Sequence, residues 1–265
     1  MDLGLAGRAC VITGASRGIG LCCATMLAAE GASLLLLGRR PEPLQAAVER
    51  CRGAGGRAES LAVDITDRDA GERVLEACLQ HFGRVDVLVN NAGTSGVRPL
   101  DELTDEEWQL QWDLHVMGPM RLMRALAPAM AQQGWGRIVN VSSSSGKRPS
   151  GTNAAYSVTK AAELSLSRAF ADAYADKGVL INAVTPGPVA SELWLEPGGM
   201  ADQAAAARGL TREQVLESTA SRVPLGRMAR AEEIASVIVF LCSERASNVT
   251  GAAWSVDGGT VPVII

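Results

Sequence analysis

The chain contains few of the residues from which metal sites and disulfide frameworks are built. Its 265 residues include two histidines and six cysteines, and no two cysteines have the Cys-x-x-Cys spacing of a zinc or redox site. Scattered cysteines of this kind are typical of reduced, buried thiols, so we expect a cytoplasmic protein without disulfides. We also expect no metal site.

Long apolar runs and a strong net charge are absent too. No run approaches the about 20 residues that a membrane-spanning helix needs. The N-terminal segment enters a strand-like pattern at once, which leaves no room for a signal peptide. The formal net charge of −4 argues against nucleic acid or an anionic membrane as the main partner. Hydrophobic residues, in contrast, make up 47% of the chain, enough for a sizeable core.

Short, nearly continuous apolar runs alternate with longer helical patterns along the chain. Such runs are expected for parallel strands that are covered on both faces. The predicted strands are Ala9–Thr13, Ser33–Leu37, Ala58–Val63, Val85–Val89, Arg137–Val141, Val179–Val184 and Ala252–Val256. The predicted helices are Gly18–Glu30, Pro43–Gly53, Asp67–Phe82, Asp105–Gln133, Asn153–Asp176 and Ala231–Ser243. This alternation predicts a doubly wound α/β (Rossmann) fold with a parallel seven-stranded sheet and helices on both faces.

The same pattern predicts one domain over residues 1–265, because no change of composition divides it. One irregular stretch, about 187–222, follows the sixth predicted strand and mixes Gly, Pro and Ala with the large apolar Trp194 and Leu195. A long excursion at this place in an α/β enzyme is typical of a substrate loop.

A glycine-rich turn, "TGASRGIG" at 13–20, joins the first predicted strand to the first helix. Gly14 permits a tight turn, Gly18 lets a pyrophosphate approach the backbone, and Gly20 allows close helix–strand packing. The free N–H groups and the positive end of the helix dipole supply an anion site. The alternative is a glycine-rich turn without a ligand, but the position between strand and helix favours a dinucleotide.

Positive charge gathers where many NAD enzymes place an acid. The second strand ends in "LLLLGRR", so Gly38 stands in place of the acid that binds the ribose diol, and Arg39 and Arg40 follow. Arg17 adds a third cation from the glycine turn. Guanidinium groups match phosphate geometry, so we interpret this cluster as a site for the 2′-phosphate of NADP(H). The alternative is a solvated basic turn.

Two further strand ends, "VDIT" at 63–66 and "VLVNNAG" at 87–93, belong to the sheet edge where α/β folds bind ligands. Asp64 either accepts a hydrogen bond from an adenine amino group or caps the following helix. Ala92 and Gly93 fit a narrow turn beside a cofactor. Asn90 either lies beside the cofactor or ties neighbouring strands together.

The segment "AAYSVTK" at 154–160 places Tyr156 four residues before Lys160. On a helix these two side chains lie on the same face. An ammonium group held there favours the phenolate over the phenol. Such a pair is common by chance, so it indicates chemistry only together with other motifs.

With these motifs in this order, the sequence resembles the short-chain dehydrogenase/reductase family, in particular its 3-oxoacyl-(acyl carrier protein) reductase-like members. The glycine turn, NNAG, a serine after the fifth strand, YxxxK, "PG" after the sixth strand and "TGAAWSVDGG" together cover nearly the whole chain. The resemblance implies that Tyr156 is the general acid/base, that Lys160 assists it and binds the nicotinamide ribose, and that Ser143 binds the substrate oxygen. It implies cofactor contacts at Gly14, Ser16, Arg17, Gly18, Ile19, Gly20, Arg39, Arg40, Asp64, Ile65, Asn91, Ala92, Gly93, Tyr156, Lys160, Pro186, Gly187, Val189 and Ser191.

One position departs from the family pattern. The family's fourth catalytic residue is an asparagine seven residues after the tryptophan of "DEEW", and here that position is His115. Pro119 lacks the N–H that would bond the His115 carbonyl in a helix, so we expect a kink there. In the family the kinked backbone holds a water, and His115 is therefore a candidate relay member. The alternative is a packing or surface histidine.

The function that these motifs predict is an NADP(H)-dependent reductase or dehydrogenase of a ketone, secondary alcohol or acyl thioester, assembled as a homotetramer or homodimer. One alternative is an NAD-dependent alcohol, sugar or steroid dehydrogenase. Another, from a different class, is a cofactor-sensing regulator without turnover, against which the complete Ser143, Tyr156 and Lys160 set argues.

Overall fold

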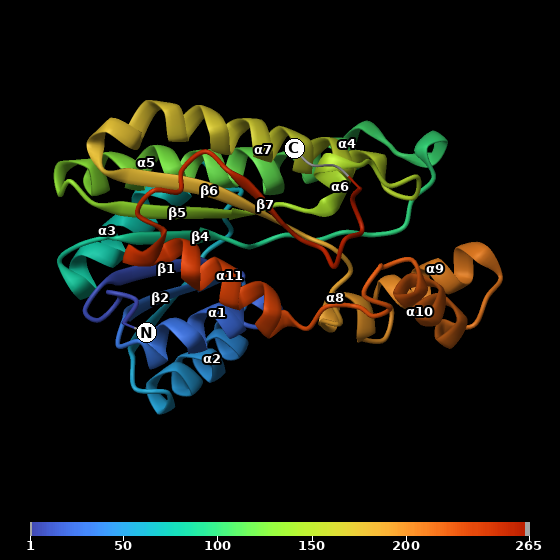
Figure 1. The fold of residues 1–265 in the computed structure, drawn as a ribbon, viewed down its shortest axis with the longest axis horizontal. Coiled ribbons are helices and arrows are strands. Elements are labelled where there is room, and N and C mark those ends of the chain that lie inside the picture. Colours follow the sequence, from blue (N-terminus) through green and yellow to red (C-terminus); the bar gives the residue numbers. More distant parts are fainter. Residues whose placement is uncertain (1, 263–265) are drawn as a thin grey trace.

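A single parallel sheet organises residues 2–262, the part of the chain that the computed structural model describes. Its seven strands have the order β3-β2-β1-β4-β5-β6-β7, with every neighbouring pair parallel (Figure 1). The strands are β1 (Ala9–Thr13), β2 (Ser33–Gly38), β3 (Arg57–Ala62), β4 (Val87–Asn90), β5 (Gly136–Val141), β6 (Val179–Pro186) and β7 (Ala253–Val256). The predicted fold is confirmed, and each strand boundary lies within two residues of its prediction.

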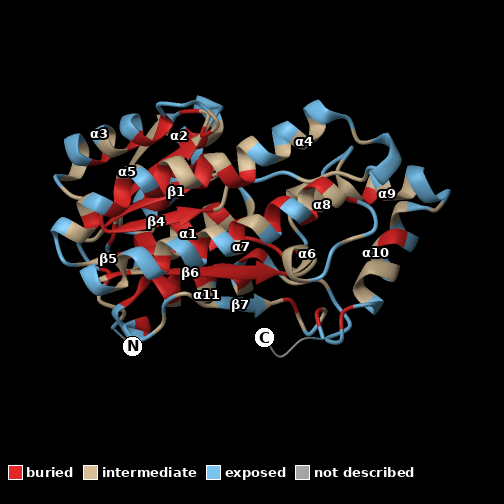
Figure 2. Ribbon diagram, turned by 90° about the horizontal axis from the view of Figure 1, so that it is seen from above, coloured by how far each residue is buried: buried red, intermediate tan, exposed pale blue. Residues whose placement is uncertain are grey.

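Helices cover the sheet on both faces, and each face has its own apolar core. The first core lies under α1 (Gly18–Ala29), α2 (Pro41–Gly53) and α11 (Ala231–Cys242). The second lies under α3 (Ala70–Phe82), α5 (Gly118–Gln132) and α7 (Ala154–Tyr174). Figure 2 shows the central strands buried between these layers, whereas the edge strand β7 is largely exposed. Both faces of the central strands are apolar because both are covered.

The helix predicted over Asp105–Gln133 is divided into three parts. A capping box between Thr104 and Glu107, the first and last residues of "TDEE", begins α4 (Asp105–Trp112). A π-helical turn, η2 (Asp113–Met117), then leads into α5. Pro119 is the second residue of α5, and its missing N–H is incompatible with a regular α-helical ladder at His115. The expected kink therefore takes the form of a π turn.

Two other predictions need correction. The third helix begins at Ala70 rather than Asp67, since Asp67 takes part in a preceding turn in which its carbonyl accepts from the Ala70 N–H. The stretch at 187–222 is largely helical and not irregular. It forms α8 (Glu192–Leu195), α9 (Met200–Arg208) and α10 (Arg212–Ser221), the last with a capping box at Thr211 and Gln214. The alanine run of α9 has high helix propensity, which the neighbouring glycines obscured.

The short elements complete the chain: η1 (Leu100–Glu102), α6 (Ser144–Lys147), η3 (Ala175–Lys177) and η4 (Glu244–Ala246). All six cysteines are unpaired; Cys22 is half-buried and the others are buried. Burial raises the pKa of the Cys78 and Cys242 thiols to about 12, which keeps them as inert core residues. Among residues 2–262, no helix combines the length and apolar character needed to cross a membrane.

Candidate active site

A cavity of about 1500 Å³ opens at the carboxyl ends of the strands. Its wall runs from the glycine turn after β1, past the ends of β2 to β6, to α8, α9 and α10. Sites for one drug-sized ligand measure about 300–1,000 Å³. The cavity therefore has room for a dinucleotide and a substrate together.

The glycine turn has the geometry that a pyrophosphate requires. Gly14 and Gly18 have φ of 62° and 55°, in the left-handed region that favours glycine. A Cβ on Gly20 would collide with the Gly14 carbonyl oxygen, so only glycine lets α1 pack this closely. Asn91 donates from Nδ2 to the Thr13 carbonyl at 2.9 Å and so fixes the turn against the end of β4. The turn thus presents its backbone to the cavity and fits a dinucleotide.

The three predicted cations line the same cavity beside this turn. Arg39 and Arg40 follow β2, where Gly38 occupies the place of an acid. Arg17 is already paired, because its Nη1 lies 2.5 Å from Oε2 of Glu196, just beyond α8. Both side chains of this ion pair are about half exposed, at 46% and 51%. The pair connects the nucleotide side of the cavity to the segment at 187–222.

The side chains of Asn90 and Asp64, at the strand ends, differ in whether they reach the cavity. Asn90 is buried, donates from Nδ2 to Oδ1 of Asn140 at 2.8 Å, and does not line the cavity, so it ties β4 to β5. Asp64 does line the cavity, yet its Oδ1 also accepts from the backbone N–H and the hydroxyl of Thr66, at 3.0 and 2.8 Å. Its carboxylate closes a local turn at the cavity wall.

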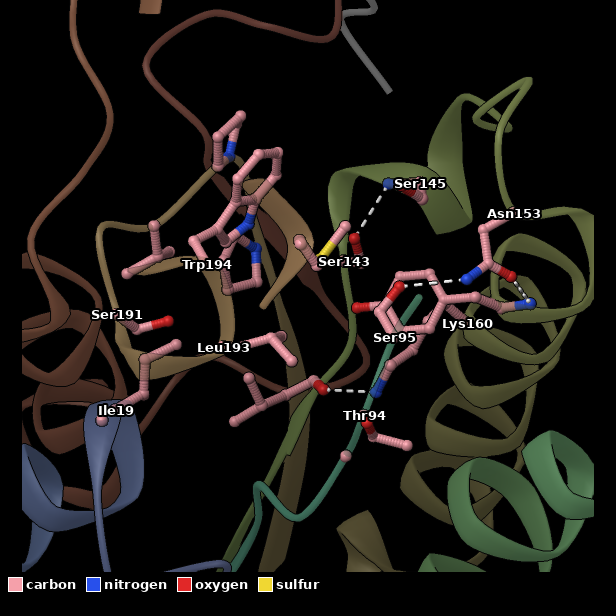
Figure 3. A pocket seen from close by; sticks show the side chains of 18 of the residues that line it. Ile19, Thr94, Ser95, Ser143, Ser145, Asn153, Lys160, Ser191, Leu193 and Trp194 are labelled. Carbon is pink, nitrogen blue, oxygen red and sulfur yellow. Dashed lines mark hydrogen bonds between the residues drawn. The ribbon is translucent and has the colours of Figure 1, made fainter. Parts of the chain in front are cut away.

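Ser143, Tyr156 and Lys160 lie together on the cavity wall that faces α8. Figure 3 shows Ser143 and Lys160 facing the cavity across from Leu193 and Trp194. Ser143 Oγ accepts from the Ser145 N–H at 3.1 Å, at the start of α6. Lys160 Nζ lies 5.8 Å from the centre of the Tyr156 ring, so the ammonium and the phenol share one face of α7 as their spacing predicts.

Asn153 is a supporting residue that the sequence reasoning missed. As the N-cap of α7, its Oδ1 accepts from the Tyr156 N–H at 2.9 Å, while its Nδ2 donates to Ser95 Oγ at 3.1 Å and to the Gly96 carbonyl. Asn153 thereby fixes the start of α7, and with it Tyr156, against the loop after β4. An asparagine directly before a helical pattern is the signal that could have identified it.

His115 is fully buried and does not line the cavity. Its Nε2 accepts from the Thr94 N–H at 3.3 Å, and its Nδ1 lies 3.1 Å from Thr159 Oγ1, which donates to the Tyr156 carbonyl. These partners assign the neutral tautomer with the proton on Nδ1. Burial, and secondarily the charge of Lys160, hold the pKa of His115 well below its usual range.

The His115 ring also packs edge-on against Tyr156, with ring centres 5.3 Å apart. These contacts are those of a packing residue next to the site, and the relay role of His115 stays a prediction. Nothing in this arrangement places the imidazole itself in contact with a cavity ligand.

The turn after β6 supplies the last group of predicted cofactor residues. Pro186 ends β6, and a Cβ on Gly187 would stand 2.9 Å from the Asp257 carbonyl oxygen, so this turn is tightly packed. Of the catalytic and cofactor residues that the resemblance implies, only Gly20 and His115 do not line the cavity. Those that do are Gly14, Ser16, Arg17, Gly18, Ile19, Arg39, Arg40, Asp64, Ile65, Asn91, Ala92, Gly93, Ser143, Tyr156, Lys160, Pro186, Gly187, Val189 and Ser191.

The part of the cavity beyond Ser143 and Tyr156 combines hydroxyl groups with apolar side chains. The hydroxyls belong to Thr94, Ser95, Ser144, Ser145, Ser150 and Thr152, and the apolar side chains include Leu193, Trp194 and Met200. Arg148 also lines it. Lys147 points elsewhere, since its Nζ donates to the Ala253 carbonyl at 2.7 Å and to Ser255 Oγ at 3.0 Å.

The fold is a doubly wound sheet with a glycine turn, and a serine, a tyrosine and a lysine lie around one cavity. This combination defines a nucleotide-dependent oxidoreductase. Comparison with known proteins makes this class specific. A family model described as "Enoyl-(Acyl carrier protein) reductase" matches residues 14–261. The 3-oxoacyl-[acyl-carrier-protein] reductase of Thermotoga maritima is 34% identical over 97% of this chain and 99% of its own. The sorbitol dehydrogenase of Cereibacter sphaeroides is 32% identical over 96% of this chain and 98% of its own.

Among solved structures, L-sorbose reductase from Gluconobacter frateurii, complexed with NADPH and L-sorbose, superposes with a TM-score of 0.93. It is 36% identical, and both chains are covered completely, at 100% each. The chain belongs to the short-chain dehydrogenase/reductase family. It is an NAD(P)-dependent oxidoreductase that acts on CH–OH or C=O groups of small molecules.

Proposed function

We propose that the protein uses NADP(H) to interconvert a ketone and a secondary alcohol, with Tyr156 as the acid/base. The observation that carries this proposal is the convergence of Ser143, Tyr156 and Lys160 on the cavity that the glycine turn also lines. A non-catalytic regulator would need the glycine turn alone. The second group of side chains is what a proton transfer requires.

In this mechanism each side chain has one task. The nicotinamide cofactor, when bound, supplies or accepts the hydride. The Tyr156 hydroxyl gives a proton to the oxygen of the ketone, or takes it from the alcohol in the reverse direction. Ser143 donates a hydrogen bond to the same oxygen and stabilises the negative charge that develops there. The Lys160 ammonium, on the same face of α7, stabilises the negative charge that forms on the Tyr156 oxygen when the proton leaves.

The choice of NADP(H) over NAD(H) rests on Arg17, Arg39 and Arg40. Arginine matches the 2′-phosphate, and Gly38 offers no carboxylate for a ribose diol. Relatives support both cofactors: L-sorbose reductase was solved with NADPH and a xylitol dehydrogenase with NAD+. The charge at the end of β2 favours NADP(H) in this chain.

Two substrate classes are consistent with the cavity. The 3-oxoacyl thioester of an acyl carrier protein is supported by the resemblance to 3-oxoacyl-(acyl carrier protein) reductases. A polyhydroxylated ketone or sugar alcohol is supported by the cluster of serine and threonine hydroxyls around Ser143, and by the similarity to L-sorbose reductase. In either case the stretch at 187–222 would act as the substrate lid, with Trp194 and Met200 facing the substrate.

We propose further that the protein is cytoplasmic, as its unpaired thiols favour, and forms a homotetramer or homodimer. Exposed Leu110 and Trp112 of α4 and Val158 of α7 are apolar groups that such an interface would cover. The apolar C-terminal segment "GGTVPVII" at 258–265 also suits such an interface, and its residues 263–265 lie outside the described residues. Light scattering coupled to gel filtration measures the assembly directly.

A substrate panel tests the proposal. NADPH oxidation is followed with 3-oxoacyl thioesters, ketoses and simple ketones side by side, and NADH is run in parallel. We expect turnover with one of the first two classes and a clear preference for NADPH. Complete absence of turnover with every ketone and alcohol, despite tight NADPH binding, would favour the regulator instead.

A further inference from the structure

Lys160 has a buried acidic neighbour that the proposed mechanism does not use. Its Nζ lies 2.8 Å from Oε2 of Glu163, one helical turn further along α7. Both side chains are almost fully buried, with exposed fractions of 4% and 2%. Glu163 is outside the set of residues that line the cavity, so it reaches the site only through Lys160.

The contacts of the Lys160 ammonium are nearly complete. One N–H donates to the Val141 carbonyl at the end of β5, at 2.8 Å, and another to Glu163. An ammonium has three N–H groups, so one remains for the cavity. The two bonds hold Nζ between β5 and α7 and fix the direction in which the third N–H points.

A buried carboxylate is costly unless a positive charge stays beside it. Burial raises the pKa of Glu163 to about 7, against the opposing effect of Lys160. The pair has zero net charge while both groups are ionised and a charge of +1 once Glu163 is protonated. Through Lys160, this change of charge is felt at Tyr156, whose ring centre is 5.8 Å from the ammonium.

Basic groups on the elements packed around α7 have partners other than Glu163. Lys147 of α6 bonds to β7, Arg121 of α5 donates to the Thr66 carbonyl, and Arg137 of β5 lies near Glu244. Lys177 of η3 donates to the Ala173 carbonyl. None of these cations therefore replaces Lys160 as the partner of the Glu163 carboxylate.

Acidic groups and the nearby histidine complete the surroundings of the pair. In the first turn of α4, Asp105 and Glu106 are exposed and Glu107 pairs with Arg98. The strand β6 contributes no titratable side chain. His115, in the π turn, is the further titratable group that feels Lys160, and it is neutral.

We propose that Glu163 is a positioning residue: its carboxylate fixes the Lys160 ammonium and reduces the positive potential that this ammonium exerts at the Tyr156 hydroxyl. The inference rests on the proposed role of Tyr156 as the acid/base. It adds a residue that tunes the pH at which Tyr156 releases its proton, so Glu163 sets the working pH of the site without touching substrate or cofactor.

The test follows the ionisation of Tyr156 by ultraviolet absorbance, and neither substrate nor cofactor is needed. The chain has only two tyrosines, so the difference between a protein and its Tyr156→Phe counterpart reports Tyr156 alone. Glu163→Gln keeps the shape of the side chain and removes its charge. We expect the midpoint of the tyrosinate titration to fall by roughly one pH unit in Glu163→Gln. The pH profile of alcohol oxidation should move in the same direction.

Two further variants make the result decisive. Asp172→Asn removes an exposed carboxylate from the same helix, where it pairs with Arg168, and should leave the Tyr156 titration unchanged. Glu163→Met, apolar and of similar length, carries the same expectation as Glu163→Gln and replaces it if the amide prevents folding. Coincident Tyr156 titrations in wild type and in a folded Glu163 variant would overturn the inference and leave only a structural ion pair.

Failure of the proposed function gives a different result. If no substrate is turned over while the Tyr156 midpoint still shifts in Glu163→Gln, the tuning by Glu163 holds and the assigned reaction does not. If turnover is found but neither the Tyr156 midpoint nor the pH profile moves, the reaction holds and the role of Glu163 does not.

Discussion

The two sides of the cavity are built in different ways. The nucleotide side, from Gly14 to Gly93, consists of backbone turns at the ends of buried strands, held by bonds such as Asn91 to Thr13. The side of the proposed lid, 187–222, contains three short helices with few buried residues, among them Ala201 and Val215. It is connected to the rest by polar contacts such as the one from the Val97 N–H to Gln203. The first side is fixed by the sheet, whereas the second is held to the rest of the molecule by contacts between side chains and loops.

This contrast explains why a substrate is hard to name while a cofactor is not. A pyrophosphate is recognised by backbone N–H groups and glycines, which leave a pattern in the sequence. A substrate is recognised by side chains from several loops, and their combination depends on how the loops are placed. Tyr156 belongs to neither side and lies between them. A change at Tyr156 therefore best distinguishes turnover of the substrate from binding of the cofactor.

Tyr156→Phe should have the largest effect on turnover. Loss of a positioned general acid costs about 10²–10⁴-fold in rate, and Phe retains the packing of the ring against His115. The dissociation constant for NADPH should stay close to wild type, because the nucleotide side is unchanged. Steady-state rates and fluorescence titration with NADPH measure the two quantities. Substantial residual turnover in Tyr156→Phe would show that the proton comes from another group.

From the sequence, most of the residues that line the nucleotide side could be identified, as could Ser143, Tyr156 and Lys160, while their roles stay predictions. Both signals are local: glycines at fixed offsets from a buried strand, and a tyrosine and a lysine four residues apart on a helix. A local pattern can be identified without knowing how distant segments pack. The missing N–H of Pro119 predicted a break in the helix at His115, but not that this break would be a π turn.

Contacts between distant segments could not be predicted in the same way. Arg17 and Glu196 are 179 positions apart, and nothing in either segment identifies the other. Glu163 is a different case, since a lysine and a glutamate three apart are a common helical pair. Only the structure shows that this pair is buried, so that water screens little of the interaction between the two charges.

Arg39→Ala should have the next largest effect, and only on one cofactor. A lost charge-assisted hydrogen bond costs about 1.5–3 kcal/mol, which corresponds to roughly 10- to 150-fold in affinity. NADPH binding should weaken by this factor, while NADH, which lacks the 2′-phosphate, serves as the internal control. Isothermal titration with both cofactors gives the ratio. Equal weakening of both would mean that Arg39 contacts a part of the cofactor other than the phosphate.

The pH dependence of stability should separate two buried groups beside Tyr156. The pKa of His115 is depressed in the folded chain, so its contribution to stability is present above about 6.5 and is lost as the pH falls below that value. The pKa of Glu163 is raised from 4.5 to about 7, so its contribution is present below 4.5 and is lost as the pH rises from there through about 7.

Thermal unfolding between pH 5 and pH 8 measures how stability changes with pH for both groups. His115→Asn should remove the loss of stability on the acid side, and Glu163→Gln should remove the decline from about pH 5 to pH 7. Asp172→Asn is the matched control and should follow the wild type. If stability depended on pH in the same way in the wild type and all three variants, His115 and Glu163 could not both be buried ionisable groups beside Tyr156.

Glu196→Ala should have the smallest effect, and it addresses the ion pair between Arg17 and the lid. Arg17 and Glu196 are both about half exposed, and exposed pairs contribute about 0–1 kcal/mol. Thermal stability should therefore hardly change. The variant frees the Arg17 guanidinium for the 2′-phosphate, so NADPH should bind up to about 5-fold more tightly, and NADH should not. Glu213→Ala, on the lid but outside the cavity lining, is the matched control. Weaker NADPH binding in Glu196→Ala would instead mean that the lid must be held against the nucleotide side for the cofactor to bind.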